Sequence, residues 1–250
     1  IARAASPQQV LVIGGGPSGM ESARLLSKKG HHVTLWEKDL DLGGTARIAA
    51  LAYEPNERLV HYLVNAVRAL PIAIQLGTTA NRENIDTLDP DHIILATGAK
   101  RIAPAITGKE QRHVFDGDQL RGILLGNSPA AIAKLSALQR LLVNIGRLSQ
   151  LLRNIRLMRF LSKLWMPIRR EVFVIGGGLV GLELAEFLVE RNRKVIVLEP
   201  GPSFGAELSI VRRARVLHLL EEDGAELHKS VGDLEIGAHM IRFSLDGEVQ

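Results

Sequence analysis

A glycine-rich pattern occurs twice in this 250-residue chain, and its second copy follows the first at a spacing of 162 residues. Val12–Gly16 and Val174–Gly178 both read Val-Ile-Gly-Gly-Gly, and Glu37 aligns with Glu199 without a gap. A repeat at so long a spacing indicates duplication of a unit of domain size, not a solenoid of short repeats. The chain is therefore expected to contain two similar folding units.

Each copy combines an apolar strand, a glycine-rich turn, a helix and a second strand, in that order. The expected elements are residues 10–13, 18–29 and 33–37 in the first copy and 172–175, 180–191 and 195–199 in the second. A strand–helix–strand unit of this kind opens a doubly wound sheet. We therefore predict an α/β protein with two tandem Rossmann-like units, each with a mainly parallel sheet, and a helical insertion between them.

Further apolar segments extend both units. Ile72–Leu76 and His92–Ala96 are expected to join the first parallel sheet, and a helix is expected near residues 208–222 of the second unit. The alternating residues Met240–Leu245 predict an antiparallel strand. The dipeptide Asp246-Gly247 predicts a hairpin turn that a further strand should follow.

The repeat and the segment within it divide the chain into three parts. Residues 1–110 are expected to form the first unit. Residues 111–169 are expected to form a connection and a basic amphipathic helical insertion, and residues 170–250 the second unit. Because the chain begins at Ile1 and ends at Gln250, soon after the predicted turn, we expect both ends to be truncated.

The insertion carries Leu or Ile at every third or fourth position of Leu135–Trp165, which is the spacing of an amphipathic helix. Gly146 is expected to interrupt this helix and Pro167 to end it. No Asp or Glu occurs between Asp118 and Glu171, so the insertion is basic. We expect its apolar stripe to pack on its own protein; the alternative is a surface that faces a membrane or coenzyme A. The anion contacts of that surface would be Arg147, Arg153, Arg156, Arg159 and Lys163.

Each glycine of a G-x-G-x-x-G pattern has a physical role when the pattern follows a strand and opens a helix. The first permits a tight turn, the second lets a pyrophosphate approach the backbone, and the third lets the helix pack closely on the strand. The helix N-terminus presents free N–H groups and a partial positive charge to the phosphates. The sequence thus predicts two dinucleotide sites, with glycines at Gly14, Gly16 and Gly19 and at Gly176, Gly178 and Gly181.

An acidic residue ends the second strand of each copy. Glu37 and Glu199 are expected to accept hydrogen bonds from both hydroxyls of an adenosine ribose. Because a carboxylate in this position repels a 2′-phosphate, Glu199 predicts a preference for NADH over NADPH. The nearby cations Arg193 and Lys194 would weaken that preference.

The composition excludes several kinds of chemistry. With no cysteine, these residues supply no disulfide, thiolate metal ligand, iron–sulfur ligand or redox-active dithiol. The eight histidines show no metal-ligand spacing, so no metal site is expected. No nucleic-acid-binding motif is present, and no apolar run is long enough to cross a membrane. We expect a cytoplasmic protein, for which a homo-oligomer is one possible state.

These motifs resemble the two-dinucleotide-binding-domain flavoproteins of the glutathione-reductase type over nearly the whole chain. The resemblance implies FAD or ADP at the first site and NADH or NADPH at the second. It thereby makes residues 1–110 an FAD- or ADP-binding domain that lacks its C-terminal return segment, and residues 170–250 a truncated NAD(P)-binding domain. The implied first site consists of Gly14, Gly16, Pro17, Ser18, Gly19, Glu37, Lys38, Gly43 and Gly44, with Ala96, Thr97 and Gly98 at the crossing between the two domains. The implied second site consists of Gly176, Gly178, Leu179, Val180, Gly181 and Glu199.

Within that group, Leu42–Gly44, Asp91–Gly98 and Trp165–Pro167 are most similar to the C-terminal half of 2,4-dienoyl-CoA reductase and related old-yellow-enzyme-type enoate reductases and amine dehydrogenases. In that family an N-terminal barrel carries FMN and a cysteine-ligated iron–sulfur cluster. The resemblance implies such a catalytic barrel as the missing partner, with hydride passing from NAD(P)H through FAD toward an enoyl or enone substrate. Amine dehydrogenases of this group often lose the second fingerprint, so its presence here favours the reductase branch.

Two questions stay open in the sequence. Glu183 matches an acid that lies near the nicotinamide and flavin in related flavoproteins, which makes it a candidate catalytic residue; the alternative is a first-turn acid favoured by the helix dipole. The function is either that of an electron-carrying oxidoreductase or that of a non-catalytic ADP- or NAD-binding module for structure or docking. The intact second fingerprint favours the enzyme, and the missing return segment favours a fragment with no activity of its own.

Overall fold

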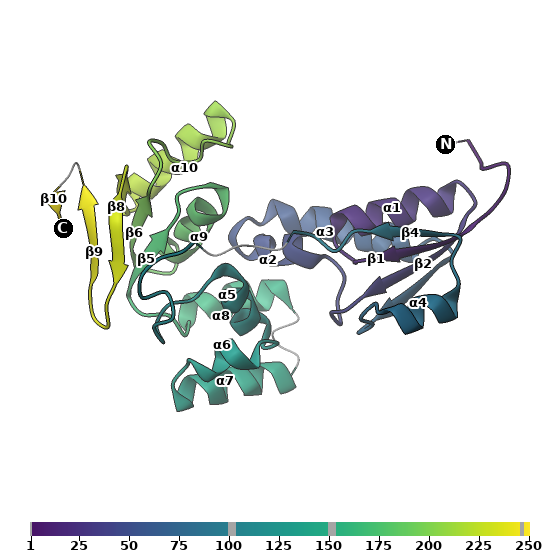
Figure 1. Ribbon diagram of the computed structural model, residues 1–250, viewed down its shortest axis with the longest axis horizontal. Helices are drawn as coiled ribbons and strands as arrows, with labels where there is room; N and C mark the ends of the chain where they lie inside the picture. The colour runs from purple at the N-terminus through teal and green to yellow at the C-terminus, as the bar shows by residue number, and fades with distance from the viewer. Residues whose placement is uncertain (1, 100–103, 150–153, 246–247) are drawn as a thin grey trace. The chain divides into compact units, whose positions relative to one another are not determined.

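The computed structural model describes residues 2–99, 104–149, 154–245 and 248–250. The chain forms two compact units, residues 1–100 and 101–250, which run from purple to teal and from teal to yellow in Figure 1. Each unit contains a parallel sheet with helices between its strands, so the predicted α/β fold with two Rossmann-like units is confirmed. The three-part division at residues 110 and 169 stays a prediction.

The first unit is built on a four-stranded parallel sheet in the order β3-β2-β1-β4. Its strands are β1 (Gln9–Ile13), β2 (His32–Glu37), β3 (Ile72–Leu76) and β4 (His92–Leu95). β1 lies between β2 and β4, and all four strands point the same way. In a sheet of this order ligands bind outside the carboxyl ends of the strands, at the switch point between β1 and β4, where the strand order reverses.

Helices cover both faces of this sheet. In the described part of the first unit they are α1 (Pro17–Lys28), α2 (Gly44–Ala52), α3 (Pro55–Arg68) and α4 (Arg82–Leu88). α1 and α3 lie on one face and α4 on the other (Figure 1). Buried Met20 of α1 and Val67 of α3 pack with Val12 and Leu35 of the sheet, which forms the core. The helix expected over residues 18–29 is confirmed as α1, whereas α2, α3 and α4 were not predicted.

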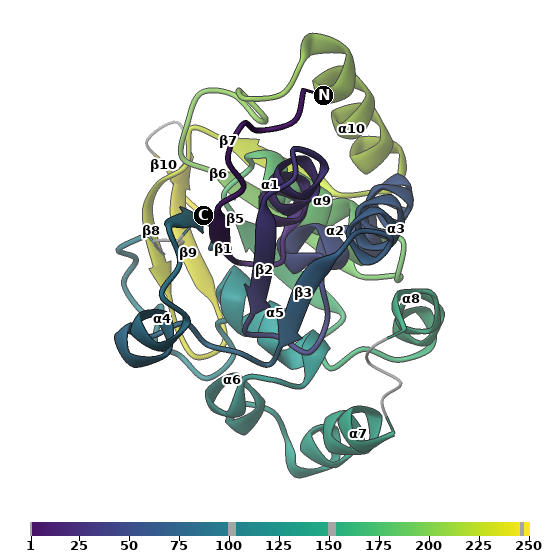
Figure 2. The same cartoon turned by 90° about the vertical axis from the view of Figure 1, so that its right-hand side faces the viewer.

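The second unit repeats this arrangement on a smaller sheet, β5-β6-β7, whose strands are also parallel. The strands are β5 (Glu171–Ile175), β6 (Lys194–Glu199) and β7 (Glu226–Lys229), and the helices between them are α9 (Leu179–Val189) and α10 (Ile210–Glu222). Figure 2 shows these elements from a second side. They confirm the second strand–helix–strand copy and the helix predicted near residues 208–222.

An antiparallel sheet in the order β10-β9-β8 completes the second unit and is drawn in yellow in Figures 1 and 2. Its strands are β8 (Gly232–Ile236), β9 (Ile241–Leu245) and β10 (Glu248–Val249). β9 confirms the antiparallel strand predicted from residues 240–245, and β10 is the strand expected after it. Asp246 and Gly247 of the predicted turn lie outside the described residues.

The predicted insertion is a series of short helices. They are α5 (Gly117–Leu125), α6 (Pro129–Ala133), α7 (Ala137–Leu148) and α8 (Ile155–Leu164). The expected interruption at Gly146 is wrong, because α7 continues through that residue to Leu148. α8 begins instead where the Asn154 side chain accepts a hydrogen bond from Leu157 N at 3.1 Å, and it ends before Pro167, as expected. Arg153 lies outside the described residues.

Much of the apolar stripe of the insertion is exposed. Leu138, Ile145 and Leu148 of α7 are 67, 51 and 78% exposed, whereas Val143 of the same helix is buried. Packing of this stripe on its own protein therefore stays a prediction. Among the described residues, no helix is long and apolar enough to span a membrane.

Candidate functional site

The first glycine-rich turn joins β1 to α1 and has no space for a side chain at two of its glycines. Gly14 has φ +112°, and a Cβ placed on it would lie 2.3 Å from the carbonyl oxygen of Ala96. A Cβ on Gly19 would lie only 1.8 Å from the carbonyl oxygen of Gly14. Both distances are shorter than any Cβ contact that a folded protein tolerates, so the turn and the helix packing require glycine at these two positions.

Glu37, at the end of β2, is hydrogen-bonded to the turn. Its Oε2 accepts from Gly15 N at 2.6 Å and its Oε1 from Asp39 N at 2.9 Å, and the residue is 6% exposed. A carboxylate has about four lone-pair positions, and these two bonds use two of them. The remaining two are suited to the two hydroxyls of an adenosine ribose. The contact with Gly15 was not predicted, because only the folded backbone brings the two residues together.

An open cradle lies at Gly16, the N-cap of α1. A Cβ on Gly16 would meet no atom within 4 Å, and no side chain caps this helix end. The N-terminus of α2 lies beside it, since a Cβ on Gly44 would be 3.1 Å from Gly16 Cα and Gly43 N donates to Gly15 O at 2.8 Å. Two helix N-termini therefore meet at an open space. Their free N–H groups and positive dipole ends fit the pyrophosphate of FAD or ADP.

The segment predicted to cross between domains runs beside this turn. Ala96 N donates to Ile13 O at 2.8 Å, so the chain continues alongside β1 after β4 ends. Gly98 has φ +78°, a left-handed conformation that favours glycine. The other residues predicted for the first site are partly or fully exposed; they are Pro17, Ser18, Lys38 and Thr97.

The second turn repeats the hydrogen bonds of the first. Glu199 Oε2 accepts from Gly177 N at 2.6 Å, and Oε1 accepts from Gly201 N at 2.6 Å. Gly176 has φ +103°, and a Cβ on Gly181 would lie 1.8 Å from the carbonyl oxygen of Gly176. The duplication therefore extends from the sequence to individual contacts, and Glu199 keeps the same two acceptor positions as its counterpart in the first unit.

The second turn differs from the first at the helix N-terminus. Glu207 Oε1 accepts a hydrogen bond from Leu179 N, and a Cβ on Gly178 would lie 2.7 Å from that oxygen. Hydrogen bonds from Leu179 N and from its own backbone N–H hold the pKa of Glu207 below its usual range. Val180, in the same turn of α9, is exposed. Glu207 was not predicted as a site residue, because 28 residues separate it from Leu179 in the sequence.

Glu183 takes part in an ion pair within the second unit. Arg212 of α10 donates from Nη2 to Glu183 Oε1 at 2.5 Å, which ties α10 to α9. The alternative of a first-turn acid is wrong, because the first turn of α9 contains no acidic residue. A role for Glu183 beside the nicotinamide stays a prediction.

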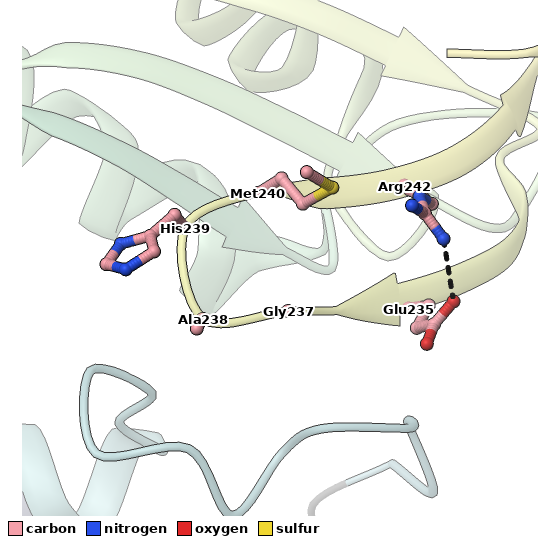
Figure 3. Close-up of a pocket in the computed structure, with 6 residues that line it drawn as sticks. All are labelled: Glu235, Gly237, Ala238, His239, Met240 and Arg242. Carbon is pink, nitrogen blue, oxygen red and sulfur yellow. Dashed lines mark ion pairs between the residues drawn. The ribbon is translucent and has the colours of Figure 1, made fainter.

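A pocket lies at the turn between β8 and β9 (Figure 3). It is lined by Glu235, Gly237, Ala238, His239, Met240 and Arg242. The only ion pair drawn across it joins Arg242 Nη1 to Glu235 Oε2 at 4.0 Å, between exposed side chains. None of the predicted site residues lines this pocket, so the candidate sites remain the two glycine-rich turns.

Two strand–turn–helix units, each with a glutamate bonded to its central glycine, define a protein with two dinucleotide-binding units. The chain matches the pyridine nucleotide-disulphide oxidoreductase family over residues 46–236 and an NAD(P)-binding Rossmann-like domain over residues 12–71. It belongs to the pyridine nucleotide-disulphide oxidoreductase family. It is therefore a flavin- and NAD(P)-binding region of an oxidoreductase.

Relatives of known name support this assignment. The chain is 36% identical over 194 residues to the bilirubin reductase of Mediterraneibacter gnavus, a match that covers 77% of this chain and 24% of the relative. It is 32% identical over 203 residues to an NADH oxidase of Thermoanaerobacter brockii, covering 80% and 25%. The solved complex of 2-naphthoyl-CoA reductase with 2-naphthoyl-CoA matches with a TM-score of 0.79 and 25% identity, covering 100% of this chain and 32% of that chain.

These matches confirm the resemblance to reductases that contain a dinucleotide-binding region of this type. The chain spans about a quarter of the length of the two curated relatives. The rest of each relative therefore has no counterpart in these residues.

Proposed function

We propose that the chain carries electrons from NAD(P)H through FAD to a second redox centre outside these residues, where an enoyl or enone substrate is reduced. The observation that supports this proposal is the pair of equivalent dinucleotide sites in one chain. Each site has a tight glycine turn and a strand-end glutamate with two free acceptor positions. Two such sites suit a protein that holds a flavin nucleotide and receives a nicotinamide nucleotide.

The first site fits a resident FAD. Gly14 and Gly19 form the turn, the N-termini of α1 and α2 face the open cradle at Gly16, and Glu37 offers its two free acceptor positions to the ribose. When bound, FAD supplies the redox chemistry by accepting a hydride from NAD(P)H and passing the electrons onward. The residues of the chain bind and orient the nucleotides.

The second redox centre and the substrate are inferred from the longer relatives. Because the chain spans about a quarter of the bilirubin reductase and the NADH oxidase, we place the second centre, FMN and an iron–sulfur cluster, in a catalytic barrel of the kind implied by the family resemblance. The names bilirubin reductase and 2-naphthoyl-CoA reductase support a conjugated, unsaturated substrate.

One observation favours a second function, a non-catalytic nucleotide-binding module. Glu207 already occupies the N-terminus of α9, where the pyrophosphate of NAD(P)H would bind. If this carboxylate cannot leave, the second site stays closed and only the first site holds a nucleotide. The two functions differ in whether NAD(P)H binds the chain when FAD is present.

We expect NADH to reduce the bound flavin at least about tenfold more efficiently than NADPH, because Glu199 repels a 2′-phosphate. Lys194 does not offset this, since it begins β6 at the end opposite Glu199 and pairs with Glu171 and Glu226 at 3.0 and 3.3 Å. Arg193 does not offset it either, since its guanidinium is held by a hydrogen bond from Nη1 to the carbonyl oxygen of Arg191 at 2.8 Å. Anaerobic mixing of the FAD-loaded chain with each nucleotide, followed by visible absorbance, measures the ratio.

The matched control is Glu199→Gln, which removes the negative charge. In this variant the rates of flavin reduction by NADH and by NADPH are expected to lie closer together. Equal rates with NADH and NADPH in the unsubstituted chain would remove the basis for the NADH preference. No bleaching of the flavin by either nucleotide would overturn the electron-carrying function and favour the nucleotide-binding module.

A further inference from the structure

The N-terminus of α9 is occupied by an anion that belongs to the protein itself. The carboxylate of Glu207 accepts from Leu179 N, one of the N–H groups that the first turn of a helix leaves without a backbone partner. It also lies 2.7 Å from the position of a Cβ on Gly178, the residue over which a pyrophosphate approaches the backbone in this fingerprint. The side chain thus stands where the proposed NAD(P)H site needs an open space.

The first unit shows the same turn without such an occupant. At the spacing of 162 residues, Glu207 corresponds to Thr45, and Gly178 corresponds to Gly16. A Cβ on Gly16 would meet no atom within 4 Å. The loops match closely in other respects, since Gly43 N donates to Gly15 O at 2.8 Å and Gly205 N donates to Gly177 O at 2.8 Å. The carboxylate is therefore a feature of the second site alone.

Electrostatics favours Glu207 in this position. The positive end of a helix dipole attracts a carboxylate, and a hydrogen bond from a backbone N–H to a charged oxygen is stronger than one to a neutral oxygen. Consistently, the bond from Leu179 N lowers the pKa of Glu207, so its side chain is charged at neutral pH. The same dipole and N–H groups attract a phosphate, so a carboxylate and a pyrophosphate compete for one place.

The carboxylate can leave without disturbing the loop that carries it. Phe204 is 8% exposed and Gly205 is held by its bond to Gly177 O, which anchors the loop. Glu207 itself is exposed. A rotation of its side chain would therefore open the N-terminus of α9 while the backbone stays in place.

We propose that Glu207 is an internal competitor of NAD(P)H, whose carboxylate occupies the pyrophosphate position until the nucleotide displaces it. This inference rests on the proposed function, because it assigns the second fingerprint to NAD(P)H. While no nucleotide is bound, Glu207 accepts the hydrogen bond of Leu179 N at the N-terminus of α9. Because NAD(P)H must displace this carboxylate, Glu207 weakens the binding of the nucleotide. A weakly held nucleotide leaves quickly, which suits a site that exchanges NAD(P)H for NAD(P)⁺ in every cycle.

The test is an anaerobic titration of NADH into the chain saturated with FAD that has first been reduced with dithionite, so that the first site is filled and NADH is not oxidised. The dissociation constant is read from NADH fluorescence. Glu207→Gln and Glu207→Ala are expected to bind NADH about tenfold more tightly than the unsubstituted chain, as the loss of a competing charge at a helix end implies. Glu221→Gln, which removes an exposed charge from α10, is the matched control and should leave the dissociation constant unchanged.

A second measurement identifies the place where Glu207 acts. Without nucleotide, Glu207→Gln should melt at a slightly lower temperature than the unsubstituted chain, because the helix N-terminus loses its anion.

The outcomes separate the two proposals. Tighter binding in both Glu207 variants supports the competitor. Equal or weaker binding in the variants, with clear NADH binding to the unsubstituted chain, overturns the competitor and leaves the proposed function intact. No NADH binding to the unsubstituted chain or to any variant overturns both.

Discussion

Gly19→Ala is expected to lower the free energy of unfolding of the first unit by at least about 3 kcal/mol. The added methyl carbon would lie 1.8 Å from the carbonyl oxygen of Gly14. Alanine favours a helix over glycine by about 1 kcal/mol, but the clash in the turn is larger than this gain. Because the clashing atom belongs to the backbone and not to a flexible side chain, the turn between β1 and α1 must open. Thermal unfolding followed by circular dichroism measures the loss, expected at about 10 °C or more.

The control for this substitution is three residues earlier in the same turn. Gly16 has φ −73° and ψ −179°, an extended conformation that any residue adopts, and its Cβ would meet no atom within 4 Å. Gly16→Ala should therefore unfold within a few degrees of the unsubstituted chain. If Gly19→Ala has the same melting temperature as Gly16→Ala, α1 does not pack on the turn as closely as the structure shows.

Gly16→Val and Gly178→Val are expected to remove nucleotide binding at one site each while the chain stays folded. In the first turn the valine side chain would fill the open cradle that the pyrophosphate needs, so FAD binding should weaken about 100-fold or more. In the second turn it would displace the flexible end of Glu207 and block the approach of NADH. Titrations of both nucleotides into both variants measure the two effects.

The two variants serve as controls for each other. Gly16→Val should keep NADH binding, and Gly178→Val should keep FAD binding. Unchanged binding of both nucleotides in both variants would mean that neither glycine-rich turn holds a dinucleotide. Loss of both nucleotides in one variant would show that the two sites are not independent.

Much of the fold follows from local sequence patterns. The repeat of Val-Ile-Gly-Gly-Gly marked the start of both units, because buried strands and tight turns leave a strong local signature. The positions of Glu37 and Glu199 followed from their distance after the glycines. The hydrogen bonds from Gly15 N and Gly177 N to these carboxylates could not be predicted, since they depend on how the strand ends meet in the folded sheet.

The errors have physical causes as well. A glycine inside a helix costs about 1 kcal/mol relative to alanine, which favourable neighbours outweigh, and α7 accordingly runs through Gly146. The position of the break in the insertion is better indicated by Asn154, a residue type that favours helix N-caps and that begins α8. The apolar residues Val60, Leu63 and Val67 have the spacing of a helix, and this is the sequence signal that indicates α3.

Glu207 illustrates what sequence patterns do not contain. The residue lies in a loop without a motif, and its contact with Leu179 N joins two segments 28 residues apart. The spacing of 162 residues nevertheless offered a clue, because Thr45 and Glu207 occupy equivalent places and differ in charge. A charge difference between two copies of a duplicated site is a reason to expect that the copies bind their ligands differently.

The most direct test of the central claim is to denature the purified chain and identify any released nucleotide by mass spectrometry, with a visible spectrum of the native sample recorded beside it. We predict released FAD and a flavin spectrum, because the first turn is open at Gly16 and has a strand-end glutamate with free acceptor positions. ADP without flavin would contradict the electron-carrying function. A chain that releases no nucleotide and binds neither FAD nor ADP when these are added would contradict the first site itself.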